Sequence, residues 1–294
     1  MIHEALRKLE KIFDLDVLEE TTITQKDITD YYSINQRAYS IIHNSKYLHM
    51  WFTEEEKRFS KKDFEKPLEY IACYASQETQ TVLELACGRG ANAAWLAKRF
   101  PNADITWIDL SPKQLSFAEY QDITYFQGDY HTLSQFADAT FDMVYIIEAL
   151  CYSWEKQRVF SEVNRILKQG GVFIVVDGYA TKSKHYLSID EQKALLLTAK
   201  GMSVEDVEEY AVVREYGEGV GLVCEKEWDV SQQVLPSMER IKRRIGWLWN
   251  IWVLSRILFW VLPKKIGYNY IAGYLMPLLI KEKVTSYMVS VFRK

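Results

Sequence analysis

Short apolar runs alternate with helical patterns through the middle of this chain. Five of these runs predict strands, at residues 82–86, 105–109, 122–130, 141–149 and 172–177. The fourth run is apolar on both faces, as expected for a buried parallel strand. Before the fifth run, apolar residues at positions 159, 160, 163, 166 and 167 form a helical stripe. This regular alternation predicts a parallel sheet covered by helices.

Helical patterns and two further strands surround this region. The first 30 residues place Leu6, Leu9 and Phe13 on one helix face, and the residues up to position 78 predict one or two more helices. We place a sixth strand at 202–213 and the final strand at 285–292. The predicted division of the chain is a helical N-terminal cap at 1–78, a core at 79–213, a helical tryptophan-rich cap insertion at 214–282, and a final core strand at 283–294.

The insertion has an unusual composition. Residues 245–262 hold four of the nine tryptophans, with basic residues on both sides. A helix over 246–262 would be about 26 Å long, shorter than the roughly 30 Å core of a bilayer. We expect a cap helix that lines an apolar pocket, with peripheral membrane contact or a homodimer through this segment as the alternatives. A wall built of Trp, Phe and Leu suits an apolar substrate.

The most specific local pattern covers residues 81–92. A short strand is followed by a tight turn with Gly88 and Gly90, and then by a helix that begins near Ala91. About twenty residues later, the second strand ends in Asp109. Glycines let backbone approach a ligand, a helix N-terminus presents free N–H groups, and an acid at this place accepts from ribose hydroxyls. The pattern predicts a site for a nucleoside-bearing cofactor.

The glycine spacing argues against a dinucleotide. Such a site has a third glycine where the helix packs on the strand, and here Asn92 and Ala93 stand in that region. The E-x-A-x-G-x-G form instead resembles motif I of the class I S-adenosylmethionine-dependent methyltransferases. The string E-x-x-R-x-L-K-x-G-G at 162–171 is similar to a second signature of these enzymes. A nicotinamide-dependent oxidoreductase is the disfavoured alternative.

This resemblance implies a fold, a cofactor and a set of contacts. The fold is a Rossmann-like α/β sheet of seven strands, mostly parallel with the last strand antiparallel, with helical cap additions, and the cofactor is S-adenosylmethionine. Glu84 is expected to act on the methionine amino group through the loop, Asp109 on the ribose and Asp129 on the adenine amine. The expected cofactor-binding residues are Glu84, Ala86, Gly88, Gly90, Asn92, Asp109, Leu110, Gln114, Asp129, Tyr130, Glu148 and Tyr32.

A narrower resemblance concerns the acceptor. Residues 147–152 are similar to the I-E-A-x-C-H string of the sterol C-methyltransferases and their small-molecule relatives, and the aromatic residues within 30–52 resemble a segment of the same group. Two departures, at 42–46 and at Tyr152, fall where the substrate would bind, so a sterol in particular is not implied. The resemblance implies a lipophilic small molecule, such as an isoprenoid, sterol-like or quinone-type lipid.

Three residues are candidates for the catalytic acid or base. Glu148 lies at the carboxyl end of a buried strand, where open α/β sheets bind ligands. His49 and Tyr39 follow, and the ring faces of Tyr32 and Tyr39 can stabilise a sulfonium by cation–π attraction. Two other functions stay open: N- or O-methylation of a more polar metabolite, and binding of the cofactor by a non-catalytic relative.

Composition and charge limit which substrates, cellular compartments and metals are expected. The net charge of −4 and the lack of a block rich in Lys and Arg argue against a nucleic acid substrate. The four cysteines are scattered and the chain starts with charged residues, which favours a cytoplasmic protein, with association to a membrane surface left open. The five histidines show no metal-ligand spacing, so we expect no required metal.

Overall fold

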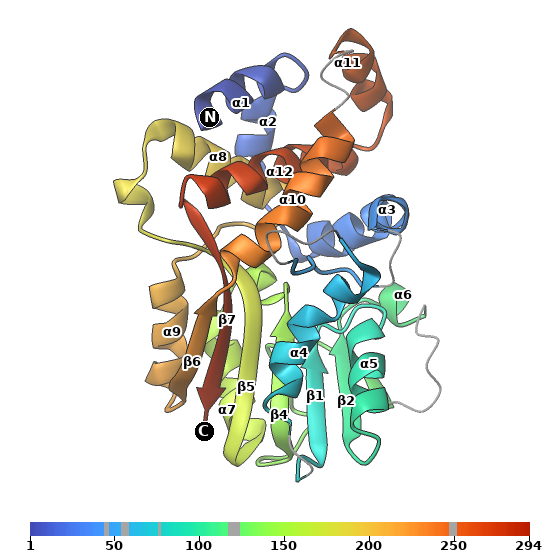
Figure 1. The fold of residues 1–294 in the computed structure, drawn as a ribbon, viewed down its shortest axis with the longest axis vertical. Helices are drawn as coiled ribbons and strands as arrows, with labels where there is room; N and C mark the ends of the chain where they lie inside the picture. Colours follow the sequence, from blue (N-terminus) through green and yellow to red (C-terminus); the bar gives the residue numbers. More distant parts are fainter. Residues whose placement is uncertain (44–46, 54–58, 76–77, 117–123, 247–251) are drawn as a thin grey trace.

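The sheet is the framework of the computed structural model, which describes residues 1–43, 47–53, 59–75, 78–116, 124–246 and 252–294. Seven strands lie in the order β3-β2-β1-β4-β5-β7-β6. Their bounds are β1 Thr81–Leu85, β2 Asp104–Asp109, β3 Thr124–Gln127, β4 Phe141–Ile147, β5 Leu167–Ala180, β6 Val223–Asp229 and β7 Thr285–Arg293. Pairs among β1 to β5 are parallel, and β7 runs antiparallel to both β5 and β6. The predicted fold class is confirmed (Figure 1).

Helices cover both faces of the sheet and form a cap above its carboxyl edge (Figure 1). Their bounds are α1 Ile2–Glu10, α2 Leu15–Glu19, α3 Gln25–His43, α4 Lys66–Ala72, α5 Ala91–Arg99, α6 Pro112–Leu115, α7 Lys156–Ile166, α8 Ile189–Gly201, α9 Tyr210–Gly219, α10 Ser231–Gly246, α11 Trp252–Val261 and α12 Lys264–Lys281. Short 3₁₀ turns lie at Lys61–Phe64, Leu150–Tyr152 and Lys184–Tyr186. Among the residues that the structure describes, no helix has both the length and the apolar character needed to cross a bilayer.

Side chains of the central strand β4 divide between two cores. Met143 and Tyr145 pack with side chains of α4, α5 and α10 on one face of the sheet. Val144 and Ile146, which alternate with them, pack with side chains of α7 and α9 on the other face. Successive side chains of a strand point to opposite faces, so a strand covered on both sides is apolar throughout. The near-continuous apolar run in the sequence reflects this double burial.

A third core belongs to the cap. Buried side chains of α1, α2, α8 and α12 pack together there, among them Leu9, Leu18, Leu195, Ile271 and Leu275. Helix α10 runs from the sheet to this cap, because it contributes to the first core and also packs along α12. The cap therefore forms a roof over the strand ends (Figure 1).

The sixth strand was predicted at the wrong place. Residues 202–213 hold the end of the turn after α8 and the first residues of α9, and the strand itself is β6, at Val223–Asp229. This segment falls inside the range predicted as a cap insertion. β6 is an edge strand with mostly exposed, polar side chains, so its sequence lacks the apolar run that marks the buried strands. The final strand is confirmed at β7.

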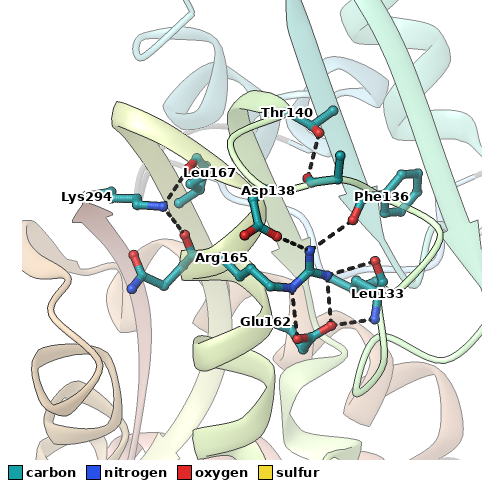
Figure 2. A network of polar contacts seen from close by, with 10 residues as sticks. Leu133, Phe136, Asp138, Thr140, Glu162, Arg165, Leu167 and Lys294 are labelled. Carbon is teal, nitrogen blue, oxygen red and sulfur yellow. Dashed lines mark hydrogen bonds and ion pairs between the residues drawn. The ribbon is translucent and has the colours of Figure 1, made fainter.

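The second signature string ties α7 to the segment that follows β3 (Figure 2). The guanidinium of Arg165 donates to the carboxylates of Glu162 and Asp138, the latter at 2.8 Å. It also donates to the carbonyl oxygens of Leu133 and Phe136, at 3.0 and 2.9 Å. Because the planar guanidinium of Arg165 donates to several acceptors at once, it fixes residues 133–138 against α7. The signature therefore has a structural role, since it holds α7 against the segment between β3 and β4.

A buried tryptophan explains one of the two glycines in the turn after β1. Gly90 is the N-cap of α5 and has a φ of +73°. A Cβ at this position would lie 1.1 Å from a ring carbon of Trp107, which is fully buried in β2. Both the left-handed backbone and the contact with the ring exclude any larger residue.

We expect Gly90→Ala to lower the free energy of unfolding by about 2–4 kcal/mol, since it adds overpacking to backbone strain. Two matched variants separate the causes. Gly170 has a φ of +79° but open space around it, and Gly219 has open space without a positive φ. Gly170→Ala should cost about 1 kcal/mol and Gly219→Ala close to nothing. Urea unfolding measures all three, and equal losses for Gly90→Ala and Gly170→Ala would contradict the role of Trp107.

Candidate active site

Four carboxyl groups gather where the parallel strands end. Glu84 lies in β1, Asp109 ends β2, Glu148 follows β4, and Asp177 lies in β5. Glu84, Asp109 and Asp177 are buried, and Glu148 is partly exposed. Ligands of open α/β sheets bind at this edge, so the acids mark the functional side of the sheet.

A cleft with a volume of about 130 Å³ runs over these strand ends. Most of the predicted cofactor-binding residues line it, namely Ala86, Gly88, Asn92, Asp109, Leu110, Gln114, Asp129, Tyr130, Glu148 and Tyr32. They come from the end of β2, from the loops after β1 to β4, and from α3, α5 and α6. Two predicted residues do not line the cleft: Glu84 lies beneath it, and Gly90 packs on Trp107.

Glu84 holds the start of α5. Its Oε1 accepts from the Asn92 side chain at 2.9 Å, and its Oε2 accepts from the backbone N–H of Ala93 at 3.1 Å. Burial raises the pKa of the Glu84 carboxyl to about 8. A carboxyl group at a helix N-terminus satisfies N–H groups that have no partner within the helix. Asn92 lines the cleft, so Glu84 acts on the cleft indirectly, by positioning the Asn92 side chain.

Asp109 joins two loops. Its Oδ2 accepts from the backbone N–H of Gly88 at 2.8 Å, and its Oδ1 accepts from that of Ser111 at 2.8 Å. Burial raises the pKa of the Asp109 carboxyl to about 6, although both of these bonds favour the ionised form. The glycine turn after β1 and the loop after β2 are thus fixed to one carboxyl group that also faces the cleft.

Asp129 is positioned by residues that sequence reasoning missed. Its Oδ1 accepts from the backbone N–H of His131 at 2.9 Å and contacts ring atom Nδ1 at 2.5 Å. The other ring nitrogen, Nε2, lies 2.8 Å from the Ser153 hydroxyl, and the ring stacks on Trp154 at 4.3 Å between centroids. We assign the proton to Nδ1, so that Ser153 donates to Nε2. The spacing of Asp129 and His131 is visible in the sequence, whereas Ser153 is joined to them only by folding.

Gln114 provides a test of whether the cleft suits a nucleoside. The residue is buried and lines the cleft, and its Oε1 has no hydrogen-bond partner among the described residues. A buried acceptor without a partner costs about 1–3 kcal/mol. An N–H or O–H group of a bound nucleoside would satisfy it. The cleft therefore offers such a ligand a buried hydrogen-bond acceptor.

A second, larger cavity of about 330 Å³ lies between the sheet edge and the cap. Its wall is mostly apolar and comes from α3, α8, α10, α11 and α12 as well as from β5 and β7. Four residues line both the cleft and this cavity: Tyr32, Leu48, Glu148 and Tyr152. The two spaces therefore meet at Glu148.

The Glu148 carboxyl is held from two sides. Its Oε1 accepts from the backbone N–H of Met50 at 2.7 Å and, in a short hydrogen bond, from the hydroxyl of Tyr287. Burial raises the pKa of this carboxyl to about 7. The backbone of Glu148 is left-handed, with a φ of +49°, which costs a residue with a Cβ about 1–2 kcal/mol. Strain of this kind is concentrated at functional sites.

The other two catalytic candidates are His49 and Tyr39. His49 is buried beside the cleft, where its ring nitrogens contact the Met50 carbonyl oxygen at 2.8 Å and the Asn92 side-chain oxygen at 3.1 Å. Burial lowers the pKa of the His49 imidazole. His49 does not line the second cavity. The side chain of Tyr39 lies outside the described part of the structure.

Comparison with known proteins identifies the central part of the chain. Residues 83–175 match the family model described as a methyltransferase domain. They include the glycine turn, Asp109, Asp129 and Glu148. This chain contains a methyltransferase domain. The match agrees with the predicted class, the class I S-adenosylmethionine-dependent methyltransferases, and supports the predicted cofactor.

Relatives of the methyltransferase domain include a protein named sterol methyltransferase-like 2 from Botryococcus braunii. It is 29% identical over 177 residues, which cover 56% of this chain and 45% of that protein. The chain thus spans about half the length of the curated relatives it matches first.

Two solved structures share the fold over most of their length. Geranyl diphosphate C-methyltransferase from Streptomyces coelicolor A3(2) has a TM-score of 0.65 and 14% identity, covering 92% of this chain and 97% of that one. The [4+2]-cyclase SpnF has a TM-score of 0.68 and 17% identity, covering 93% and 97%. Since one of the two is named as a cyclase, the shared fold alone does not fix the reaction.

The contacts of His131 generate a test of the predicted role of Asp129 in cofactor binding. We expect His131→Ala to weaken binding of both S-adenosylmethionine and S-adenosylhomocysteine by about tenfold, because Asp129 loses a charge-assisted partner. His131→Asn, which can present a donor near the position of Nδ1, should restore part of the affinity. Isothermal calorimetry measures all three proteins. Unchanged affinity, or a loss confined to one of the two ligands, would show that His131 does not position Asp129.

Proposed function

We propose that this protein transfers a methyl group from S-adenosylmethionine to a neutral, apolar small molecule of the isoprenoid, sterol-like or quinone-type lipids. The observation that carries the proposal is the meeting of two unlike spaces at Glu148. One is a cleft with a glycine turn and several acids, and the other is a larger apolar cavity. A transfer between a polar donor and an apolar acceptor needs this arrangement.

Three features of the cleft support S-adenosylmethionine as the donor: a glycine turn, an unpartnered acceptor and buried acids. Gly88 has no side chain, so a ligand can approach its backbone closely. The Oε1 atom of Gln114 has no hydrogen-bond donor among the described residues and can accept from a ligand. When bound, this cofactor supplies a methyl group activated by a positively charged sulfur. Buried carboxyl groups favour such a cation, because it offsets the cost of their own ionisation. In this proposal Asp109 holds the ribose, Asp129 the adenine amine, and Asn92, supported by Glu84, the methionine amino group.

The charges around the second cavity indicate a neutral acceptor. Among the described residues that line it, none is Lys, Arg or His, and the ionisable acids are Glu148 and Asp177. A diphosphate or carboxylate in this space would face like charge and lose its hydration. In this proposal the acceptor therefore differs from the geranyl diphosphate with which a structural neighbour was crystallised.

Glu148 is the group that we propose accepts the acceptor's proton. It faces both spaces, whereas His49 lines the cleft alone. Both described hydrogen bonds of its carboxyl engage Oε1, which leaves Oε2 to take a proton. A pKa of about 7 suits a base that works at neutral pH, since both protonation states are then accessible.

An assay with methyl-labelled S-adenosylmethionine tests the function. We expect methylation of a neutral isoprenoid or sterol presented in detergent, and no methylation of geranyl diphosphate. The rate should rise with pH up to about 7 and then level off, because the base acts only when ionised. Glu148→Gln should lower the rate by about 100-fold or more and change cofactor affinity far less. Turnover of geranyl diphosphate alone would overturn the proposed acceptor class.

Tyr287→Phe is the matched control for the pH profile. The Tyr287 hydroxyl donates to Glu148 and favours its ionised form, so its removal should raise the pKa of Glu148 and move the profile to higher pH. A merely structural role would lower the rate at every pH without moving the midpoint. An unmoved midpoint in Tyr287→Phe would contradict the assignment of the profile to Glu148.

A further inference from the structure

Helix α11 is apolar on a face that solvent reaches. Ile257, Trp260 and Val261 are 57%, 87% and 70% exposed. Their spacing of three and four residues places them on one side of the helix. A helix that is apolar all round is normally buried, and large exposed apolar side chains grouped together mark an interaction surface. This exposed face, Ile257, Trp260 and Val261, is called the outer face of α11.

The opposite side of α11 belongs to the wall of the second cavity. Phe259 packs against Phe13 and Tyr270, with ring centroids 4.8 and 5.1 Å apart. Leu258, Phe259 and Leu262 line the cavity. Leu258 is also 42% exposed, so the cavity wall reaches the molecular surface at this helix. One short helix therefore carries both an unpartnered apolar face and part of the wall that would contact an apolar acceptor.

The charges around α11 indicate what the outer face meets. Between Glu239 and Glu282 the sequence contains no acidic residue. The basic residues in this stretch are Arg240, Lys242, Arg243, Arg244, Arg256, Lys264, Lys265 and Lys281. Lys265 pairs with Asp27 and Lys281 with Glu239, whereas Arg256 and Lys264, next to the outer face, are exposed. In Figure 1, α11 lies at the far end of the cap, away from the sheet.

We propose that the outer face of α11 docks on a membrane surface that carries anionic lipid headgroups, and that the apolar acceptor enters the second cavity from that membrane. The inference rests on the proposed function for the entry of the acceptor. Helices that lie at a membrane interface combine exposed Trp and aliphatic side chains with Lys and Arg. A second copy of the chain would bring two basic surfaces together, so like charges disfavour that occupant.

Co-sedimentation of the full chain with vesicles tests the docking without cofactor or acceptor. We expect binding to vesicles of phosphatidylcholine with phosphatidylglycerol, weaker binding to phosphatidylcholine alone, and a loss of binding at high salt. The double variant Ile257→Ser/Trp260→Ala and the double variant Arg256→Glu/Lys264→Glu should each weaken binding by about tenfold or more. Matched controls with exposed residues elsewhere, Tyr186→Ala/Ile189→Ser and Lys226→Glu, should bind like the unmodified protein.

Two outcomes would overturn the docking. One is equal binding of every variant to both kinds of vesicle, or no binding by the unmodified protein. The other is a doubled mass in sedimentation equilibrium that Ile257→Ser/Trp260→Ala abolishes, which would make a second copy the occupant. Calorimetry with S-adenosylmethionine on the same samples separates the two proposals. Cofactor binding without vesicle binding would leave the methyltransferase function in place, and vesicle binding without cofactor binding would remove it.

Discussion

The site depends on buried carboxyl groups that accept backbone N–H groups from neighbouring loops. Four of the strands that reach the site, β1, β2, β4 and β5, each provide one such acid, within the strand or directly after it. The bonds run from Ala93 to Glu84, from Gly88 and Ser111 to Asp109, from Met50 to Glu148, and from Cys151 and Gly178 to Asp177. Loops carry irregular backbone whose polar groups must find partners when buried. The strand ends therefore determine where the loops lie, and with them the walls of both cavities.

The same burial sets the electrostatics of the site. Partial or complete removal of the four carboxyl groups from water raises their pKa values, to about 8 for Glu84, about 7 for Glu148 and about 6 for Asp109 and Asp177. Acids in this state favour a bound cation and oppose a bound anion. One arrangement thus accounts for a cleft that suits a sulfonium with its ammonium group, and for an adjoining cavity that suits a neutral acceptor.

Sequence patterns revealed the parts of the fold that depend on local chemistry. The buried strands have apolar runs, and the turn after β1 needs glycine, so both are visible in the sequence. β6 escaped because an edge strand with polar side chains has no such run. The residues that hold Glu148 could not be predicted from the sequence for another reason. Met50 and Tyr287 reach Glu148 across 98 and 139 residues of chain, and only the folded sheet brings them together.

Calorimetry of cofactor binding tests the central claim most directly. The unmodified protein should bind S-adenosylmethionine with micromolar affinity and should not bind NADH. Asp109→Ala should weaken S-adenosylmethionine binding by about ten- to a hundredfold, since a charged acceptor that holds both loops is lost. Asp104→Ala, at the exposed opposite end of the same strand, should leave it unchanged. Equal affinity in the Asp109 and Asp104 variants, or binding of NADH in place of S-adenosylmethionine, would contradict the account.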